Sequence, residues 1–411
     1  MNSIRLALTL LCVHACVACT PTANMDPIDA VLESAVENGR IPGVIAMSAN
    51  SDGVTYQGAF GKRDSSSNTE MTMDTIVQLA SMTKAITSVA VMQLVEQNKV
   101  GLDRAASEYL PELANVQVLD GFDTAGKPVL RAPKTAVTVR QLLTHTSGYV
   151  YEVWNENAAH YVQLGEVDSV LAGGDGFLAA PLAFDPGESW EYGISTDVLG
   201  VLVEAISGQS LDDYFREYIF DPLAMPDTYF NLPEEKLPRL ATIYARSSDG
   251  GLTAMPPSPT EDTFFSGGGG LLSTANDYIR FLRALLNNGE LDGARILSAE
   301  TVELMAQNHI DELEAANTFI SVMPDFSNDF DFIPGSVDKF GLGFLINGEP
   351  IPGGRSAGSL AWAGIFNTYF WIDRDQDICG VLMTQILPFY DADVVGLLNQ
   401  FETAVFSAAK R

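Results

Sequence analysis

The pattern of apolar and polar positions divides the chain into two β-rich ends and a helix-rich middle. Residues 43–60 (GVIAMSANSDGVTYQGAF) form two β-rich runs joined by a Ser-Asp-Gly turn, which predicts a hairpin. Residues 81–98 are apolar almost all round and predict a buried helix. β-rich runs return late in the chain at 339–347, 359–373 and 378–386. A final helical pattern follows at 392–409.

The middle of the chain, from about residue 105 to residue 260, consists of helical patterns broken by proline and glycine. TVRQLLTHTSG and DVLGVLVEAISG each close on a glycine suited to a helix end. Because hairpin-like joins dominate at both ends, we expect the terminal strands to share one antiparallel sheet, covered by the first and last helices. The pattern predicts an α/β fold of the α+β type, with an α/β domain over 25–105 and 266–411 and a largely helical insert over 106–265.

The first 24 residues have the pattern of an export signal. They contain one arginine, an apolar run too short to span a bilayer stably, and small residues at the end. The segment CVAC, ending at Cys19, resembles a bacterial lipoprotein processing site, although Cys16 occupies a position where leucine is usual. We expect an exported protein, periplasmic or lipid-anchored at Cys19, with no membrane span in the mature chain. Translation from Met25 would instead give a cytoplasmic protein.

Composition excludes several classes of partner. Acidic residues outnumber basic ones 53 to 23, and a net charge of -30 repels nucleic acid and anionic lipid, so neither is an expected partner. Cys12, Cys16 and Cys19 have no histidine or carboxylate to complete a ligand set, so we expect no metal and no cofactor. The mature chain keeps only Cys379, which rules out an internal disulfide and favours a core position.

The first candidate for chemistry is the pair Ser81 and Lys84. Their i, i+3 spacing places both side chains on one helix face, within hydrogen-bonding range, so the lysine amine could activate the serine. The helix N-terminus also favours negative charge at the serine. In the alternative interpretation, Ser81 only caps the helix and Lys84 reaches solvent. The pattern is weak by itself, because SVDK at 336–339 matches it with no helix behind it.

A second candidate nucleophile is Ser356 in GRSAG (354–358), which fits G-x-S-x-G. That motif requires a helix after the serine and a histidine later in the chain. The residues after Ser356 are strand-like, and all four histidines precede it (His14, His145, His160 and His309). We therefore interpret GRSAG as a glycine-rich turn and His145, in THTSG, as a helix-end residue.

Five segments in order carry a resemblance to a known superfamily: 80–103 around ASMTK, TVRQLLTHTSG, FDPGESWEYGIS, GGGGLLSTANDYIRFL and AGSLAWAGIFNTYFWID. Together they resemble the serine β-lactamases and penicillin-binding proteins, and within these the family VIII carboxylesterases, relatives of class C β-lactamases. The resemblance runs from about residue 27 to the C-terminus. It implies that Ser81 is the acylated nucleophile, Lys84 its proton partner and Tyr192 the second general acid or base.

The resemblance also implies a substrate pocket. An oxyanion hole would form from the backbone N–H groups of Ser81 and Ile365. WAG at 362–364 stands where relatives carry a three-residue strand motif whose third residue is glycine. The resemblance therefore implies that Trp362 and Gly364 line the pocket. Trp362 also replaces the cationic residue that binds the carboxylate of a β-lactam. Ile194 stands where β-lactamases place an amide-binding asparagine. Both departures favour a neutral ester.

The preferred hypothesis is therefore a serine hydrolase that cleaves short-chain carboxylic esters through an acyl-enzyme on Ser81. Its partner is a small-molecule ester, and the oligomeric state is left open. The alternatives are a β-lactamase or D-alanyl-D-alanine peptidase, an acyltransferase that passes the acyl group to an alcohol, and a non-catalytic binding protein on the same fold. The presence of Ser81, Lys84 and Tyr192 together disfavours the last of these.

Overall fold

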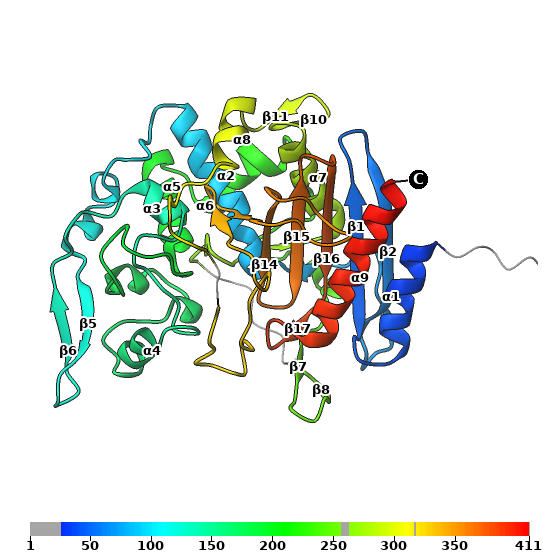
Figure 1. Cartoon of the computed structure of the whole chain (residues 1–411), viewed down its shortest axis with the longest axis horizontal. Coiled ribbons are helices and arrows are strands. Elements are labelled where there is room, and N and C mark those ends of the chain that lie inside the picture. The colour runs from blue at the N-terminus through cyan, green and yellow to red at the C-terminus, as the bar shows by residue number, and fades with distance from the viewer. Residues whose placement is uncertain (1–25, 256–262, 316–317, 411) are drawn as a thin grey trace, which may run out of the picture.

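The structure is a computed structural model that describes residues 26–255, 263–315 and 318–410 (Figure 1). The leader at 1–24, with Cys19, lies outside the described residues, so the export signal and the lipid anchor stay predictions. Within the described ranges, no helix is both long enough and apolar enough to cross a membrane. Cys379 is buried, as predicted.

An eight-stranded antiparallel sheet joins the two ends of the chain. Strands β1 and β2 form the predicted hairpin, and β1 also pairs with β16, with Ile45 opposite Met383. The strand order is β12-β13-β14-β15-β16-β1-β2-β3, which confirms the predicted fold class. The bounds are β1 Gly43–Ala49, β2 Val54–Asp64, β3 Thr69–Glu70, β12 Lys339–Phe340, β13 Leu345–Ile346, β14 Leu360–Gly364, β15 Thr368–Asp373 and β16 Ile378–Met383.

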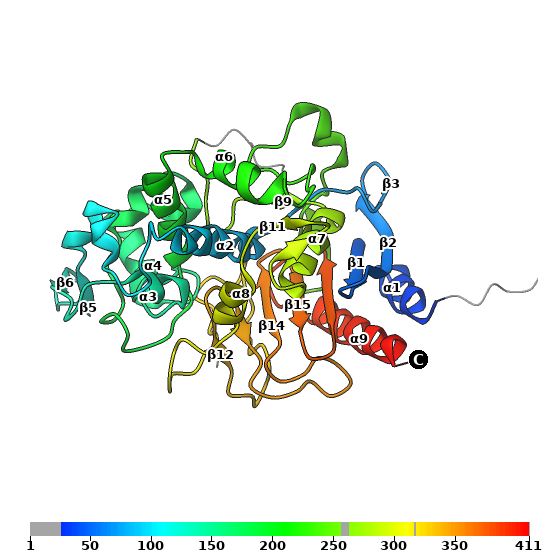
Figure 2. The same cartoon turned by 90° about the horizontal axis from the view of Figure 1, so that it is seen from above.

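Helices cover both faces of this sheet. Helices α1 (Pro27–Glu37) and α9 (Ala392–Ala409) pack against each other on one face, while α7 (Ala275–Leu286) packs against β1 and β16 on the other (Figures 1 and 2). Every residue of β1 is buried, because this central strand is covered on both sides. Helix α8 (Ala299–Met305) lies on the same side as α7 (Figure 2).

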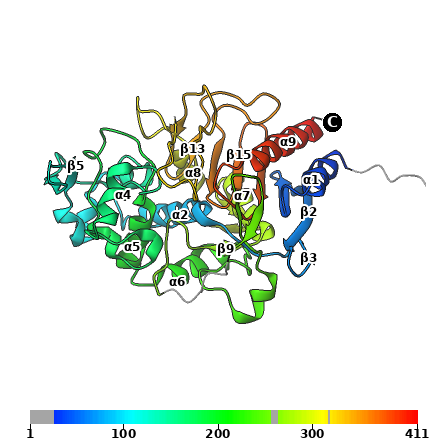
Figure 3. The ribbon, with the colours of Figure 1, turned by 90° about the horizontal axis from the view of Figure 1, so that it is seen from below.

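Helix α2 (Thr83–Glu96) connects this sandwich to the helix-rich region. Its residues are buried from Thr83 to Leu94, which explains an apolar pattern without a polar face. It packs against α5 and lies between the helix-rich region and the sheet (Figures 2 and 3). The other helices and strands are α3 Val139–Leu143, α4 Glu156–Gln163, α5 Ser195–Ser207, α6 Leu211–Phe215, β4 Val77–Gln78, β5 Val118–Phe122, β6 Pro128–Arg131, β7 Tyr244–Arg246, β8 Leu252–Ala254, β9 Leu272–Ser273, β10 Glu290–Leu291, β11 Ala294–Arg295 and β17 Ile386–Leu387.

The region predicted as a helical insert is more mixed than its pattern indicates. It contains two hairpins besides its helices, β5 with β6 and β7 with β8. Strand β17, near the C-terminal end, pairs in parallel with β7. The helix-rich region is thus hydrogen-bonded directly to the end of the chain, and the domain limits given above stay a prediction.

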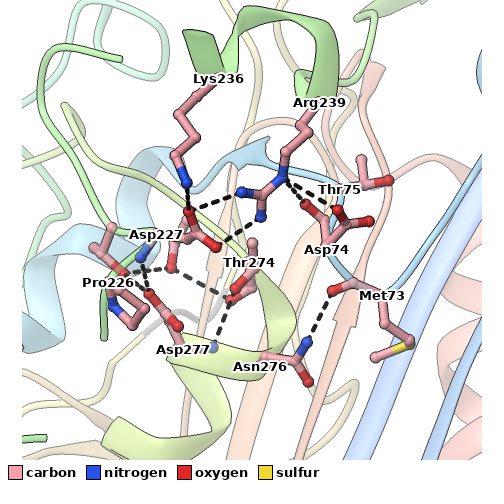
Figure 4. A network of polar contacts seen from close by, with 12 residues as sticks. Met73, Asp74, Thr75, Pro226, Asp227, Lys236, Arg239, Thr274, Asn276 and Asp277 are labelled. Carbon is pink, nitrogen blue, oxygen red and sulfur yellow. Dashed lines mark hydrogen bonds and ion pairs between the residues drawn. The ribbon is translucent and has the colours of Figure 1, made fainter. Parts of the chain in front are cut away.

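A polar network fixes the loops next to α7 (Figure 4). Asp227 accepts hydrogen bonds from Lys236 and from both terminal nitrogens of Arg239, which also contacts Asp74. Asp277, in the first turn of α7, accepts from the backbone N–H of Asp227 at 2.7 Å and from the hydroxyl of Thr228. The network ties the segment before β4 to the start of α7, and β4 leads directly to Ser81.

This network predicts a pH-dependent stability. Burial raises the pKa of Asp277 from 3.8 to about 6. The folded state therefore holds this proton more tightly than the unfolded state, so the stability that protonation contributes is complete below about pH 4 and is lost as the pH rises through about 6. The full change corresponds to roughly 3 kcal/mol. We expect the free energy of unfolding of Asp277→Asn minus that of wild type to increase as the pH rises from 5 to 7.5. Urea denaturation at each pH measures both values. A difference that stays constant with pH would contradict this.

Candidate active site

Ser81 lies on a short 3-10 turn, Ala80–Met82, that runs directly into α2. Ala80 has φ of +48°, a left-handed conformation that a residue with a side chain rarely adopts. Neighbouring elements hold the turn: the Leu79 N–H donates to the Leu271 carbonyl at 2.9 Å, and the Tyr278 hydroxyl donates to the Met82 carbonyl at 2.9 Å. Ser81 is thus presented at the N-terminus of a buried helix.

Lys84 points into the protein, contrary to the interpretation in which it reaches solvent. Its side chain is buried, with 2% of the residue exposed. The Nζ atom donates to the Gly268 carbonyl at 2.7 Å, to the Tyr151 hydroxyl at 3.0 Å and to the Ser81 Oγ at 3.3 Å. The structure therefore joins Ser81 and Lys84 by a hydrogen bond, as their spacing predicts.

Tyr192 lies in the loop before α5, beside Lys84. The Lys84 Nζ is 4.9 Å from the centre of the Tyr192 ring. The ring packs against Trp362 and His145, with centroid distances of 4.9 Å and 5.0 Å. The hydroxyl is buried, and none of the described residues forms a hydrogen bond with it. Two segments far apart in the sequence, the start of α2 and the loop before α5, thus bring Ser81, Lys84 and Tyr192 together.

The end of β14 lies against the Ser81 turn. A Cβ atom at Gly364 would stand only 2.2 Å from the Leu79 carbonyl oxygen, and the Thr368 hydroxyl donates to the same oxygen at 3.2 Å. Glycine is therefore required for this close approach. Ile365 follows immediately and lines the same cavity as Ser81, and its part in an oxyanion hole stays a prediction.

A cavity of about 690 Å³ opens over Ser81. Tyr192, Trp362, Gly364 and Ile365 are among its lining residues, so Trp362 and Gly364 lie in the same cavity as Ser81. Among its described lining residues the only charged one is Asp197, and none is basic. The rest of the wall contains a large aromatic group: Tyr151, Trp154, Phe230, Phe264, Phe319, Phe326, Phe330, Phe332, Phe366 and Phe389.

Ile194 does not line this cavity, contrary to the sequence-based expectation. It occupies the N-cap position of α5 and lines a separate cavity of about 110 Å³, together with Glu152 and Glu191. The reason is the tight packing at Gly193, where a Cβ atom would stand 2.1 Å from the Tyr149 carbonyl oxygen. The chain turns there into α5, and Ile194 lies against the second cavity and not against the one over Ser81.

The other sequence candidates have structural positions. Ser356 lies in a turn before β14, and its Oγ accepts a hydrogen bond from the Gln376 amide at 3.0 Å. His145 comes directly after Thr144, the C-cap residue of α3, and has φ of +58°, as expected of a helix-end residue. Burial lowers the pKa of His145 well below its usual value, and the charge of Lys84 adds to this. A neutral His145 therefore supports the Tyr192 ring by packing.

Two residues next to Lys84 are not singled out by the sequence. Tyr151 accepts the Lys84 hydrogen bond, and its own hydroxyl donates to the Asp197 Oδ2 at 3.4 Å. Asp197 is buried and accepts from the Ser266 hydroxyl at 2.5 Å and the Gly268 N–H at 3.0 Å. Tyr151 lies just after THTSG and Asp197 just after EYGIS, but one sequence alone does not mark either as a site residue.

Comparison with known proteins identifies the family of this chain. A sequence profile described as Beta-lactamase matches residues 28–404. The chain belongs to the Beta-lactamase family. This Beta-lactamase-family protein is 31% identical over 410 residues to ML-236A carboxylate methylbutanoyltransferase mlcH of Penicillium citrinum, covering 96% of this chain and 97% of that one.

Two further relatives are similar over nearly their whole length. Lovastatin esterase of Penicillium rubens is 30% identical, with 91% of this chain and 96% of the relative covered. The unliganded structure of simvastatin synthase (LovD) from Aspergillus terreus is 30% identical, with a TM-score of 0.82 and coverage of 94% of this chain and 100% of that one. The family resemblance inferred from the five segments is confirmed, and the chain is an enzyme of the β-lactamase superfamily with a serine hydrolase-type fold.

The contact between β14 and the Ser81 turn predicts that adding one methyl group at Gly364 strongly lowers activity. In Gly364→Ala, the added Cβ would push β14 away from the Leu79 carbonyl and displace the Ile365 N–H. Loss of one oxyanion donor lowers kcat by about 100-fold or more. We expect a loss of that size in ester cleavage, measured as kcat/KM, whereas Gly396→Ala, at an open position of α9, should keep wild-type activity. Equal activity of the two variants would argue against an oxyanion hole at Ile365.

Proposed function

We propose that this protein transfers the acyl group of a neutral carboxylic ester through an acyl-enzyme on Ser81, with an apolar alcohol as the preferred acceptor and water as the competing one. The observation that carries the proposal is the Ser81 Oγ, 3.3 Å from the buried Lys84 Nζ at the floor of an aromatic cavity. A buried amine next to a serine hydroxyl is the arrangement needed to activate the nucleophile.

In the first half of the reaction, neutral Lys84 removes the Ser81 proton while Oγ attacks the ester carbonyl. Negative charge develops on the carbonyl oxygen and is stabilised by the backbone N–H groups of Ser81 and Ile365. The bond to the alkoxide breaks, and Tyr192 donates the proton with which the alcohol leaves. In the second half, the Tyr192 phenolate takes the proton of the acceptor hydroxyl while the acceptor oxygen attacks the carbonyl carbon of the acyl-enzyme. The bond from that carbon to Ser81 Oγ then breaks, and the Lys84 ammonium returns its proton to Oγ. The product is a new ester, or an acid when water is the acceptor.

The choice of acceptor rests on the cavity wall and on the relatives. Aromatic side chains favour an apolar alcohol over water near the acyl group. The names of the relatives include both a methylbutanoyltransferase and an esterase, each covering more than nine-tenths of this chain. The expected short-chain esterase activity is thus retained in the proposal as the hydrolytic branch of the same acyl-enzyme.

The cavity also bears on the β-lactamase alternative. Lys84 lies beneath Ser81, but no basic side chain is among the described lining residues, and Trp362 packs against Tyr192 and Phe332. A substrate carboxylate would therefore lack an ionic partner in the cavity and would face Asp197. These features favour a neutral ester over a β-lactam or a peptide carboxylate.

The assignment of the nucleophile predicts different effects for two serines. We expect Ser81→Ala to abolish ester cleavage and covalent labelling by a fluorophosphonate, because the Ser81 Oγ lines the cavity and is bonded to the Lys84 amine. Ser356→Ala should retain most of both, since Ser356 contacts a glutamine amide and no base. Peptide mapping identifies the labelled residue. A label on Ser356 would reverse the assignment.

The acceptor preference is tested by product analysis. We expect p-nitrophenyl butyrate in the presence of increasing 1-hexanol to give a rising share of hexyl butyrate over butyric acid, whereas glycerol at equal hydroxyl concentration should give little ester. The reason is that only the apolar alcohol replaces water in the aromatic cavity. Chromatography measures both products. If butyric acid remains the sole product at every hexanol concentration, the protein is a hydrolase and the transferase proposal is wrong.

A further inference from the structure

The hydrogen bonds of Lys84 can be counted proton by proton. A lysine ammonium has three N–H donors, and in this structure the three acceptors around Nζ are the Gly268 carbonyl, the Tyr151 hydroxyl and the Ser81 Oγ. When Lys84 is neutral it keeps two N–H groups and one lone pair. If Gly268 and Tyr151 accept the two N–H groups, the lone pair points at Ser81, which is the direction needed to remove the serine proton.

This arrangement works only if the Tyr151 oxygen is free to accept. A carboxylate is an acceptor only, so the bond between Tyr151 and Asp197 directs the Tyr151 proton toward Asp197 and leaves its oxygen facing Lys84. Burial raises the pKa of Tyr151 well above its usual value, and the charge of Asp197 adds to this. Tyr151 therefore keeps its proton and is unsuited to act as a base.

Asp197 is in turn held from two sides. The Ser266 hydroxyl and the Gly268 N–H both donate to its Oδ1, which leaves Oδ2 for Tyr151. A Cβ atom at Gly268 would stand 2.1 Å from Oδ2, so glycine is required where the chain passes between Asp197 and Lys84. Gly268 thus bonds to both residues: its N–H donates to Asp197, and its carbonyl accepts from the Lys84 Nζ.

We infer that Tyr151 and Asp197 are positioning residues for the acylation step: Asp197 orients the Tyr151 hydroxyl, and Tyr151 with the Gly268 carbonyl aims the Lys84 lone pair at Ser81. Tyr192 makes no such bond, and its hydroxyl remains available to the leaving or accepting alcohol. The inference rests on the proposed acyl-enzyme at Ser81 and assigns different tasks to the two tyrosines that flank Lys84, whose ring centres lie 5.0 Å and 4.9 Å from Nζ.

The first experiment measures nucleophile activation in the full chain. In Tyr151→Phe the Lys84 amine loses one orienting acceptor, and we expect fluorophosphonate labelling of Ser81 and the kcat for p-nitrophenyl butyrate to fall about 10- to 100-fold. The KM should stay near wild type, because Tyr151 acts through Lys84. The matched control is Tyr149→Phe: it loses a buried hydroxyl whose contact is the Leu178 carbonyl at 3.5 Å, and it should label at the wild-type rate.

The second experiment tests the order of action by a double-mutant cycle. In Asp197→Asn the amide can donate to the Tyr151 oxygen, which then turns its own proton toward Lys84, so we expect a loss similar to that of Tyr151→Phe. The double variant should lose no more than Tyr151→Phe alone, because Asp197 acts through Tyr151. Thermal unfolding checks that each variant is folded. If Asp197→Asn does not fold, Ser266→Ala takes its place in the cycle, since it removes one donor to Asp197.

Three results would overturn the inference. Wild-type labelling of Ser81 in Tyr151→Phe would reject the positioning role while leaving the acyl-enzyme in place. Fully additive losses in the cycle would reject the order in which Asp197 acts through Tyr151. If Tyr151→Phe were as inactive as Ser81→Ala while Tyr192→Phe still acylated and turned over, the two tyrosines would have the opposite tasks. Absence of any label on Ser81 in the wild type is a separate result, which rejects the proposed function itself.

Discussion

The burial of Lys84 is the constraint on which the site depends. A lysine amine removed from water must find hydrogen-bond partners inside the protein, since an unsatisfied polar group of this kind costs several kcal/mol. Its partners come from the turn at Ser81, the loop at Tyr151 and the glycine run at Gly268. These segments are far apart in the sequence, so the fold must bring all of them to one point before the serine has a base.

Glycine and one strained residue make this convergence sterically possible. Gly268 passes between Asp197 and Lys84, and Gly364 lets β14 approach the Leu79 carbonyl, both at distances that a Cβ atom would not allow. Ala80 holds a left-handed conformation directly before Ser81. Backbone strain next to a nucleophile persists only when the surrounding contacts over-determine it. Here the bonds from Leu271 and Tyr278 to the turn provide those contacts.

Part of the aromatic wall comes from a different region of the chain than Ser81, Lys84 and Tyr192. Ser81 and Lys84 lie at the start of α2 and Tyr192 in the loop before α5, whereas Phe319, Phe330 and Phe332 of the wall lie between α8 and β12. Phe319 and Phe330 stack at 4.4 Å. Relatives with different named activities share the fold over most of its length. This agrees with the general rule that a fold supports several chemistries through the residues placed on it.

The sequence by itself determined the sheet, the buried helix, the pairing of Ser81 with Lys84 and the turn at Ser356, because these follow from local periodicity, spacing and motif order. Tyr192 and Ile365 needed the family resemblance as well. Only the tertiary structure decided that Ile194 faces a separate cavity and that Tyr151 and Asp197 adjoin Lys84. The reason is physical: the direction of a loop side chain and its distant partners are set by packing between segments, which leaves no periodic trace in the chain.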